Sequence, residues 1–239
     1  MTQLARVGVF LSLLAGVFGA VLQPALAGTS EEDKAQDAAV VLRELVRIPE
    51  KGIPPKLLEQ AYAIAVIPEV LKVGFVFGGR RGEGLLAVRT DSGKWSNPSF
   101  IALTGASIGF QIGASSTDIV LVFKNRKSID RITKGKITLG GDASVAAGPV
   151  GRSAEAATDI RFESEVYSYS RARGVFAGVS AEGAALSIDD TGNADFYDDR
   201  NIGPHEIFAS TNRNALPDAG KDFLRTLEKY APTHGTPTQ

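Results

Sequence analysis

Apolar residues recur every three or four positions near both ends of the chain, and this spacing predicts amphipathic helices. The first predicted helix covers residues 33–48 and stops before Pro49. A second is expected over residues 54–68, because a proline pair begins it and another proline closes it. A third lies over residues 223–230, where apolar side chains share one face.

Between residues 73 and 197 the pattern changes to short runs of β-branched and aromatic residues separated by glycines, which is typical of strands and turns. The turn residues at 91–93 and 190–192 are expected to join neighbouring elements. The predicted strands cover residues 73–77, 85–90, 100–112, 118–124, 137–147, 159–169, 174–179 and 184–189. Together these elements predict an α+β fold, with a twisted antiparallel β-sheet or barrel flanked by N-terminal helices and a short C-terminal helix.

The first residues have the pattern of a secretory signal peptide. Arg6 precedes an apolar run over residues 7–22, and small residues lead up to Ala27. We expect cleavage after Ala27, one domain over residues 28–230 and a flexible tail over 231–239. A membrane-spanning helix is the alternative, but the apolar run is short for the roughly 20 residues that a crossing needs. The expected location is therefore periplasmic or secreted, with peripheral attachment to a membrane.

The composition of the chain argues against several kinds of binding site. The chain has no cysteine and two histidines, which argues against disulfides, a thiol-linked lipid anchor and a zinc site. Its formal net charge of −1 argues against a general nucleic-acid binder. The acidic run over residues 182–199 does not have the spacing of an EF-hand calcium loop and is interpreted as solvated turns. No metal and no cofactor are expected.

Two motifs resemble catalytic or nucleotide-binding signatures. Gly-Ala-Ser-Ile-Gly at residues 105–109 matches the nucleophile elbow of serine hydrolases, and His205 follows in the usual chain order. Gly-Glu-Gly at residues 82–84 resembles a loose dinucleotide fingerprint. Both signatures require a helix directly afterwards, whereas the residues that follow are predicted to be extended. We therefore expect no catalytic residue and no enzymatic activity.

A basic segment over residues 124–136 is the strongest electrostatic feature of the chain. Asp130 is its only acid, and a short helix ending at Gly135 is expected to turn Ile129 and Ile132 inward. The segment is either a solvated helix and turn or a patch for anionic lipid head groups. Arg152 follows a Gly-Pro-Val-Gly turn and is a further candidate for a structural or head-group contact. The candidate lipid-binding residues are Lys124, Arg126, Lys127, Arg131, Lys134, Lys136 and Arg152.

Five motifs occur in the order and spacing of the SYLF domain, which the chain resembles over about residues 35–197. The motifs are WSNPSF at 95–100, GFQIG at 109–113, AAGPVGR at 146–152, YSYS at 167–170 and GVFAG at 174–178. This resemblance implies a lipid-binding module without enzymatic activity. Eukaryotic relatives bind phosphoinositides, some also bind actin, and bacterial relatives are exported. The family's lipid contacts are placed in an N-terminal amphipathic helix, here residues 33–48, and in basic residues.

The sequence thus predicts a non-enzymatic lipid-binding protein of the cell envelope that contacts anionic phospholipid head groups. The alternative is an envelope protein-interaction or structural module without lipid specificity. The expected partners are phospholipid or a membrane surface, together with a protein partner in the envelope. Because export would separate the protein from actin, we do not expect actin to be a partner.

Overall fold

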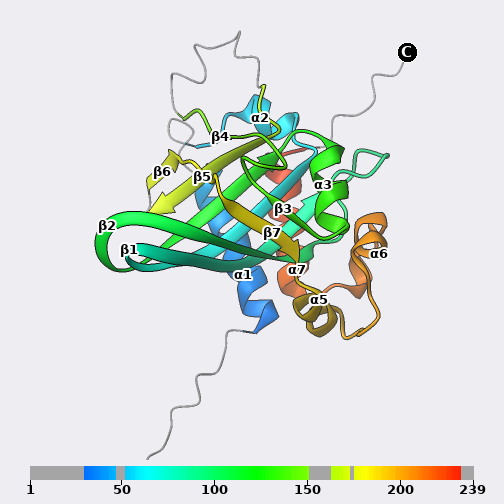
Figure 1. The fold of residues 1–239 in the computed structure, drawn as a ribbon. Helices are drawn as coiled ribbons and strands as arrows, with labels where there is room; N and C mark the ends of the chain where they lie inside the picture. Colours follow the sequence, from blue (N-terminus) through cyan, green and yellow to red (C-terminus); the bar gives the residue numbers. More distant parts are fainter. Residues whose placement is uncertain (1–29, 47–51, 151–162, 173–174, 233–239) are drawn as a thin grey trace, which may run out of the picture.

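A long curled hairpin forms the centre of the molecule. In the computed structural model, which describes residues 30–46, 52–150, 163–172 and 175–232, β1 (Ala63–Val88) and β2 (Ser99–Phe123) run antiparallel over nearly their whole length. Both strands bend back on themselves near the middle of their length (Figure 1). The bend brings the two halves of β1 together, so that a Cβ atom at Gly84 would lie 2.7 Å from Ile67 Cα and closer still to the carbonyl oxygen of Val66.

Five shorter strands extend this hairpin into a curled, open half-barrel. The C-terminal half of β2 pairs with β5 (Val166–Ala172), which also pairs with β6 (Val175–Gly178) and, in parallel, with β4 (Val145–Ala147). The N-terminal half of β2 pairs with β7 (Ala184–Ile188), and β7 pairs with β3 (Lys136–Thr138). The predicted α+β fold is confirmed.

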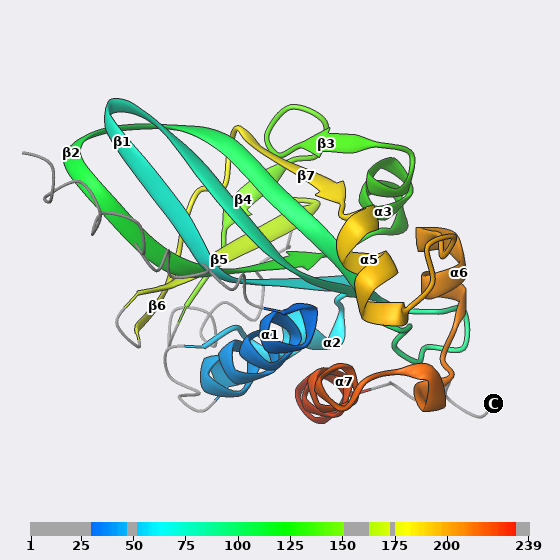
Figure 2. The ribbon, with the colours of Figure 1, turned by 90° about the horizontal axis from the view of Figure 1, so that it is seen from below.

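Helices α1 (Glu31–Val46), α2 (Pro55–Glu59) and α7 (Asp218–Tyr230) lie together on one side of the sheet (Figure 2). The buried face of α1 packs against α7 and β1. Arg43 of α1 also forms an ion pair with Asp222 of α7, with an N to O distance of 2.5 Å. The first and last described helices are therefore joined into one layer that covers the sheet.

The two faces of the sheet have separate hydrophobic cores. Ile64 and Val66 of β1 belong to the core under α1 and α7, whereas Ala65 and Ile67 belong to the core on the opposite face. Helix α3 (Arg126–Thr133) contributes to this second core. Because neighbouring residues at the start of β1 are buried on opposite faces, residues 63–67 form a continuous apolar run without a polar alternation.

The predicted helix over residues 54–68 is wrong. Helix α2 ends at Glu59, and β1 begins at Ala63. The apolar run after Ala61 fits both helix and strand by periodicity alone, and its β-branched members Ile64 and Val66 are buried in the sheet.

The predicted breaks between several strands are also wrong. Segments 73–77 and 85–90 fall mainly within the single strand β1, and segments 100–112 and 118–124 fall mainly within the single strand β2. Conversely, segment 137–147 contains two short strands separated by a turn, in which Gly140 has a φ of +87°. Glycines therefore mark a bend inside the long strands but chain reversals elsewhere, at Gly93 between β1 and β2, at Gly140 after β3 and at Gly183 before β7, all with positive φ.

The acidic stretch contains a helix where a turn was predicted. Helix α5 (Asp190–Tyr197) starts after Asp189, whose side chain accepts a hydrogen bond of 3.0 Å from the Gly192 amide. This bond satisfies one of the free N–H groups at the helix start. Helix α6 (Pro204–Ala209) follows and was also missed. In the described ranges, no helix is both long enough and apolar enough to cross a membrane.

Candidate functional site

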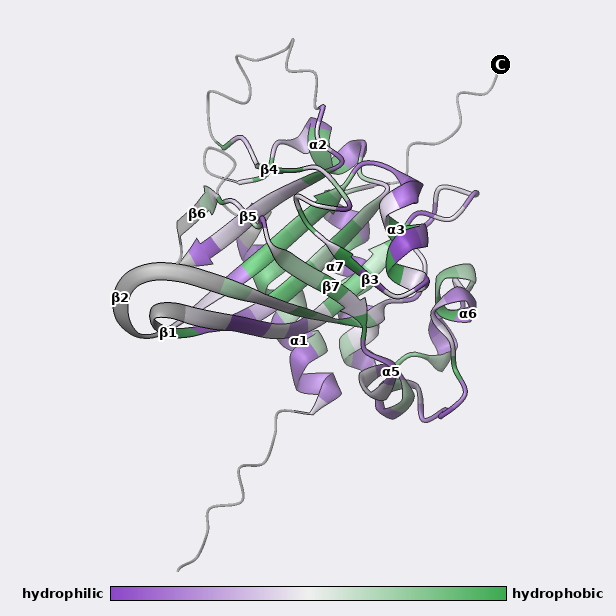
Figure 3. Cartoon of the chain, in the orientation of Figure 1, coloured by the Kyte–Doolittle hydropathy of each residue, from purple (hydrophilic) through white to green (hydrophobic). Residues whose placement is uncertain are grey.

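Helix α3 carries the basic segment and is fixed at both ends. The Asn125 side chain accepts a hydrogen bond of 3.2 Å from the Ser128 amide, and Gly135 follows the helix with a φ of +153°. Ile129 and Ile132 are buried, as predicted. They anchor the helix to the sheet, and Arg126, Lys127 and Asp130 are exposed on its hydrophilic outer side (Figure 3).

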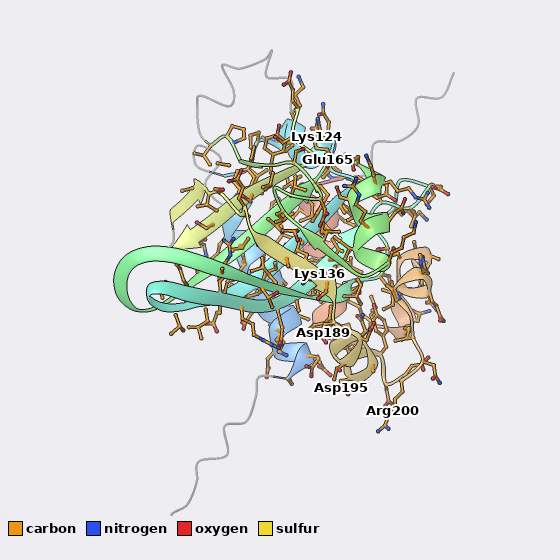
Figure 4. All side chains as sticks on the ribbon, viewed as in Figure 1. Lys124, Lys136, Glu165, Asp189, Asp195 and Arg200 are labelled. Carbon is orange, nitrogen blue, oxygen red and sulfur yellow. The ribbon has the colours of Figure 1, made fainter. Side chains whose placement is uncertain are left out.

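Three cations of this segment are exposed and form no ion pair with any residue that the structure describes: Lys127, Lys134 and Lys136. They come from α3, from the residue that caps it and from the start of β3. We call these three residues the α3 surface. Lys124, in contrast, is half-buried, and its backbone amide donates a hydrogen bond of 2.9 Å to the Glu165 carbonyl (Figure 4).

Two other cations of the segment are partly neutralised by carboxylates. Arg126 lies 3.8 Å from Asp91 and 3.5 Å from Asp130. Arg131 lies 3.9 Å from Glu165. Asp91 and Glu165 come from distant parts of the sequence, so the six cations face three carboxylates in the fold where the sequence alone showed one.

A cleft of about 400 Å³ lies beside α3. Its walls come from the turn after β1, from α3 and from α6. Arg126 lines this cleft together with Asp91 and Asp130, and Tyr62 and Phe208 supply aromatic rings. Burial raises the pKa of the Tyr62 hydroxyl, partly offset by the Arg126 charge, so this hydroxyl stays protonated at neutral pH and can donate a hydrogen bond.

Two cations of the sheet, Arg171 and Arg80, are held away from α3 by other partners. Arg171 forms an ion pair of 2.6 Å with Asp118 and another with Glu44. Arg80 donates to the carbonyl oxygens of the turn before β7, at residues 181 and 182. Arg152 lies outside the described residues, so its candidate role stays a prediction. The predicted signal peptide over residues 1–27 lies outside them as well.

The apolar face of α1 is already used inside the fold. Ala35, Ala38, Ala39 and Leu42 have no exposed surface. They pack in the core shared by α1, α7 and the sheet. In this conformation the helix cannot insert the same face into a bilayer.

The WSNPSF motif has a structural role. The Trp95 ring is buried, and its Nε1 donates a hydrogen bond of 2.9 Å to the Ala231 carbonyl just after α7. Arg89 stacks over this ring at 4.0 Å and donates to the same carbonyl at 2.8 Å. Asn97 and Arg213 add further hydrogen bonds between the motif and the segment before α7. The motif therefore fastens the C-terminal helix to the hairpin.

The serine motif at residues 105–109 lies in the middle of β2. The residues after Ser107 continue the strand, and the backbone of Ser107 pairs with Gly78 of β1. This segment therefore lacks the strand, sharp turn and helix of a nucleophile elbow. Within the described residues, no group of His, Asp and Glu side chains has the arrangement of a metal site.

Sequence reasoning missed the cleft and most of the residues that line it. Asp91 was assigned only to a turn, and Phe208 had no assigned role. His205 was considered only for hydrolysis and as one of two histidines too few for a zinc site, yet it lies at this cleft. Because these residues are far apart in the chain, only the packing of α6 beside α3 could reveal that they share one site.

A family model described as "Ysc84: Las17-binding protein actin regulator" matches residues 104–230. "Protein YSC84" of Saccharomyces cerevisiae is 40% identical over 210 residues, covering 84% of this chain and 44% of the relative. "SH3 domain-containing YSC84-like protein 1" is 37% identical in Xenopus laevis and 35% identical in Homo sapiens, each over 83% of this chain. The chain spans 60% and 59% of these two relatives. The predicted SYLF resemblance is confirmed.

These matches correct one expectation. Actin was not expected among the partners, but the matching model is described as an actin regulator, and another yeast relative, 40% identical over 190 residues, is named "LAS seventeen-binding protein 3". That expectation came from the predicted signal peptide alone and is wrong for the family.

Proposed function

This chain belongs to the Ysc84 family, and from that premise we propose that it is a non-catalytic binding module whose α3 surface contacts anionic phospholipid head groups. The observation that carries this proposal is the set of three exposed cations, Lys127, Lys134 and Lys136, which form no ion pair within the described part of the chain. Each cation close to an anionic membrane contributes about 1 kcal/mol to binding. Three cations together would give weak, reversible attachment.

Replacing Lys127, Lys134 and Lys136 together by glutamine is expected to weaken binding to anionic vesicles by up to about 3 kcal/mol, on the order of 100-fold. The fold should survive, because all three side chains are exposed. Co-sedimentation with phosphatidylglycerol vesicles at several salt concentrations measures the effect. Wild-type binding should fall as salt rises, because screening acts over about 8 Å at physiological ionic strength.

A matched control removes the same charge elsewhere. Lys56, Arg200 and Lys229 are exposed and lie on α2, before α6 and on α7. Their triple glutamine variant should bind the vesicles almost as tightly as wild type. Equal losses in the two triple variants would show that only total charge matters, and unchanged binding in the α3 variant would refute the α3 surface as the contact.

A protein partner from the actin machinery is the second candidate, and the names of the family model and of the yeast relatives favour it. The relatives are longer than this chain, so their partners need not bind through the shared domain. Co-sedimentation with filamentous actin, using the same two triple variants, tests this candidate directly. Binding to actin without binding to vesicles would replace the lipid proposal.

We also propose that the protein is exported and acts at the cell envelope. The support is the pattern of residues 1–27, with one early charge, an apolar run and small residues before Gly28. Protein isolated from its own host should then begin at Gly28, which N-terminal sequencing can establish. An intact Met1 on cytoplasmic protein would refute export.

A further inference from the structure

The cleft beside α3 has a charge arrangement that does not suit a simple anion. Arg126 lines it with 64% of its side chain exposed, and the carboxylates of Asp91 and Asp130 lie within 4 Å of its guanidinium. Arg89 lines it as well, but its guanidinium is already held over the Trp95 ring and by backbone carbonyl oxygens. A ligand with only negative charge would bind Arg126 but would also meet both carboxylates. A ligand with only positive charge would meet the opposite conflict with Arg126.

A ligand that carries both charges resolves this conflict. Its anionic group can take the place of a carboxylate at Arg126, and its cationic group can pair with the carboxylate that is released. The number of charge pairs is then unchanged. The side chains of Asp91 and Arg126 are exposed, so separating them costs little, since exposed ion pairs contribute about 0 to 1 kcal/mol.

Aromatic residues line the same cleft. Tyr62 and Phe208 belong to its wall, with Val88 and Ile129. Aromatic faces attract quaternary and primary ammonium groups, an effect that adds to pairing with a carboxylate. The cleft volume of about 400 Å³ lies within the range of roughly 300 to 1,000 Å³ that small-molecule sites occupy.

We propose that this cleft binds a zwitterionic phosphate ester that carries an alkylammonium group, the chemistry of phosphoethanolamine and phosphocholine. The phosphate accepts hydrogen bonds from Arg126, and the ammonium lies at Asp91 and Asp130 beside Tyr62 and Phe208. The choice of phosphate as the anionic group rests on the proposed function in phospholipid binding. The α3 surface would then supply general attraction to a membrane, and the cleft would select the head group.

Titration of the isotope-labelled protein with soluble head groups, followed by NMR, tests the proposal. Phosphoethanolamine and phosphocholine should bind at least tenfold more tightly than glycerol 3-phosphate, choline or glycine betaine. Their chemical-shift changes should fall on residues 89–92, 126–133 and 205–209. Equal binding of glycerol 3-phosphate would refute zwitterion recognition, and equal binding of glycine betaine would refute the requirement for phosphate.

Two variants separate the charges of the site. Asp91→Asn should remove most of the preference for zwitterions over glycerol 3-phosphate, because it removes one ammonium partner. Arg126→Gln should abolish binding of both phosphate esters. Asp195→Asn is the control, since Asp195 is exposed on α5 and away from the cleft (Figure 4). Loss of zwitterion binding in the control, or none in Arg126→Gln, would overturn the assignment.

The source of the head group and the proposed function are tested separately. Lysophosphatidylethanolamine below its micelle concentration should bind at the same residues as free phosphoethanolamine if a lipid is the ligand. Binding of the free ester alone would assign the site to a soluble metabolite and overturn the lipid source. The triple variant of Lys127, Lys134 and Lys136 should keep zwitterion binding, so failure of the α3 surface and failure of the cleft give different results.

Discussion

Gly84→Ala is expected to destabilise the protein by about 3 kcal/mol or more, or to prevent folding. A methyl group at Gly84 would lie 2.7 Å from Ile67 Cα, and closer still to the Val66 carbonyl oxygen. These atoms belong to the backbone of the other half of β1, so they cannot move aside as a flexible side chain would. The curl of the hairpin depends on this close approach. Urea unfolding measures the loss, and the yield of soluble protein measures it if the variant does not fold.

Gly79→Ala is the matched control on the same strand. The nearest atom to a Cβ at Gly79 is the Gly105 carbonyl oxygen at 4.0 Å, which is an ordinary contact. The loss of backbone freedom in the unfolded chain should make this variant equal to wild type or more stable by up to about 1 kcal/mol. Similar stability of the Gly84 and Gly79 variants would show that the two halves of β1 are not held this closely.

Trp95→Ala should destabilise the protein by about 3 to 5 kcal/mol, the usual cost of removing a buried tryptophan ring. The ring is fully buried, carries the stacked guanidinium of Arg89 at 4.0 Å and holds the Ala231 carbonyl through Nε1. The variant loses all three interactions and leaves a cavity between the hairpin and α7. Denaturant unfolding should show a lower midpoint with an unchanged slope, provided that α7 unfolds together with the sheet.

Trp95→Phe separates packing from hydrogen bonding. It keeps an aromatic ring and removes the Nε1 donor, while Arg89 still donates to the Ala231 carbonyl at 2.8 Å. The expected loss is about 1 to 2 kcal/mol, because the carbonyl keeps one partner. If Trp95→Ala costs less than 1 kcal/mol, the motif does not fasten α7.

Gly84→Ala and Trp95→Ala both lie away from the α3 surface. They should therefore weaken vesicle binding only in proportion to the unfolded fraction, and folded protein should bind as wild type does. This relation distinguishes them from the triple lysine variant, in which binding is expected to fall while stability stays the same.

The sequence determined the local elements whose signals lie within a few residues. The spacing of apolar residues was sufficient for α1 and α7, and Gly135 with Ile129 and Ile132 was sufficient for α3 and its buried side. The family motifs were also visible in the sequence. The structural role of Trp95 could not be seen there, because its hydrogen-bond partner, the Ala231 carbonyl, is 136 positions away in the chain.

Only the tertiary structure decided which parts of the chain meet. The register of β1 on β2 shows that the glycines of the hairpin bend the strands without ending them, and burial on both faces makes residues 63–67 a strand where periodicity suggested a helix. The same long-range packing brings Asp91 and Glu165 to the basic segment and α6 to the cleft. Charge and shape at a site depend on distances in space, and the order of residues along the chain does not specify those distances.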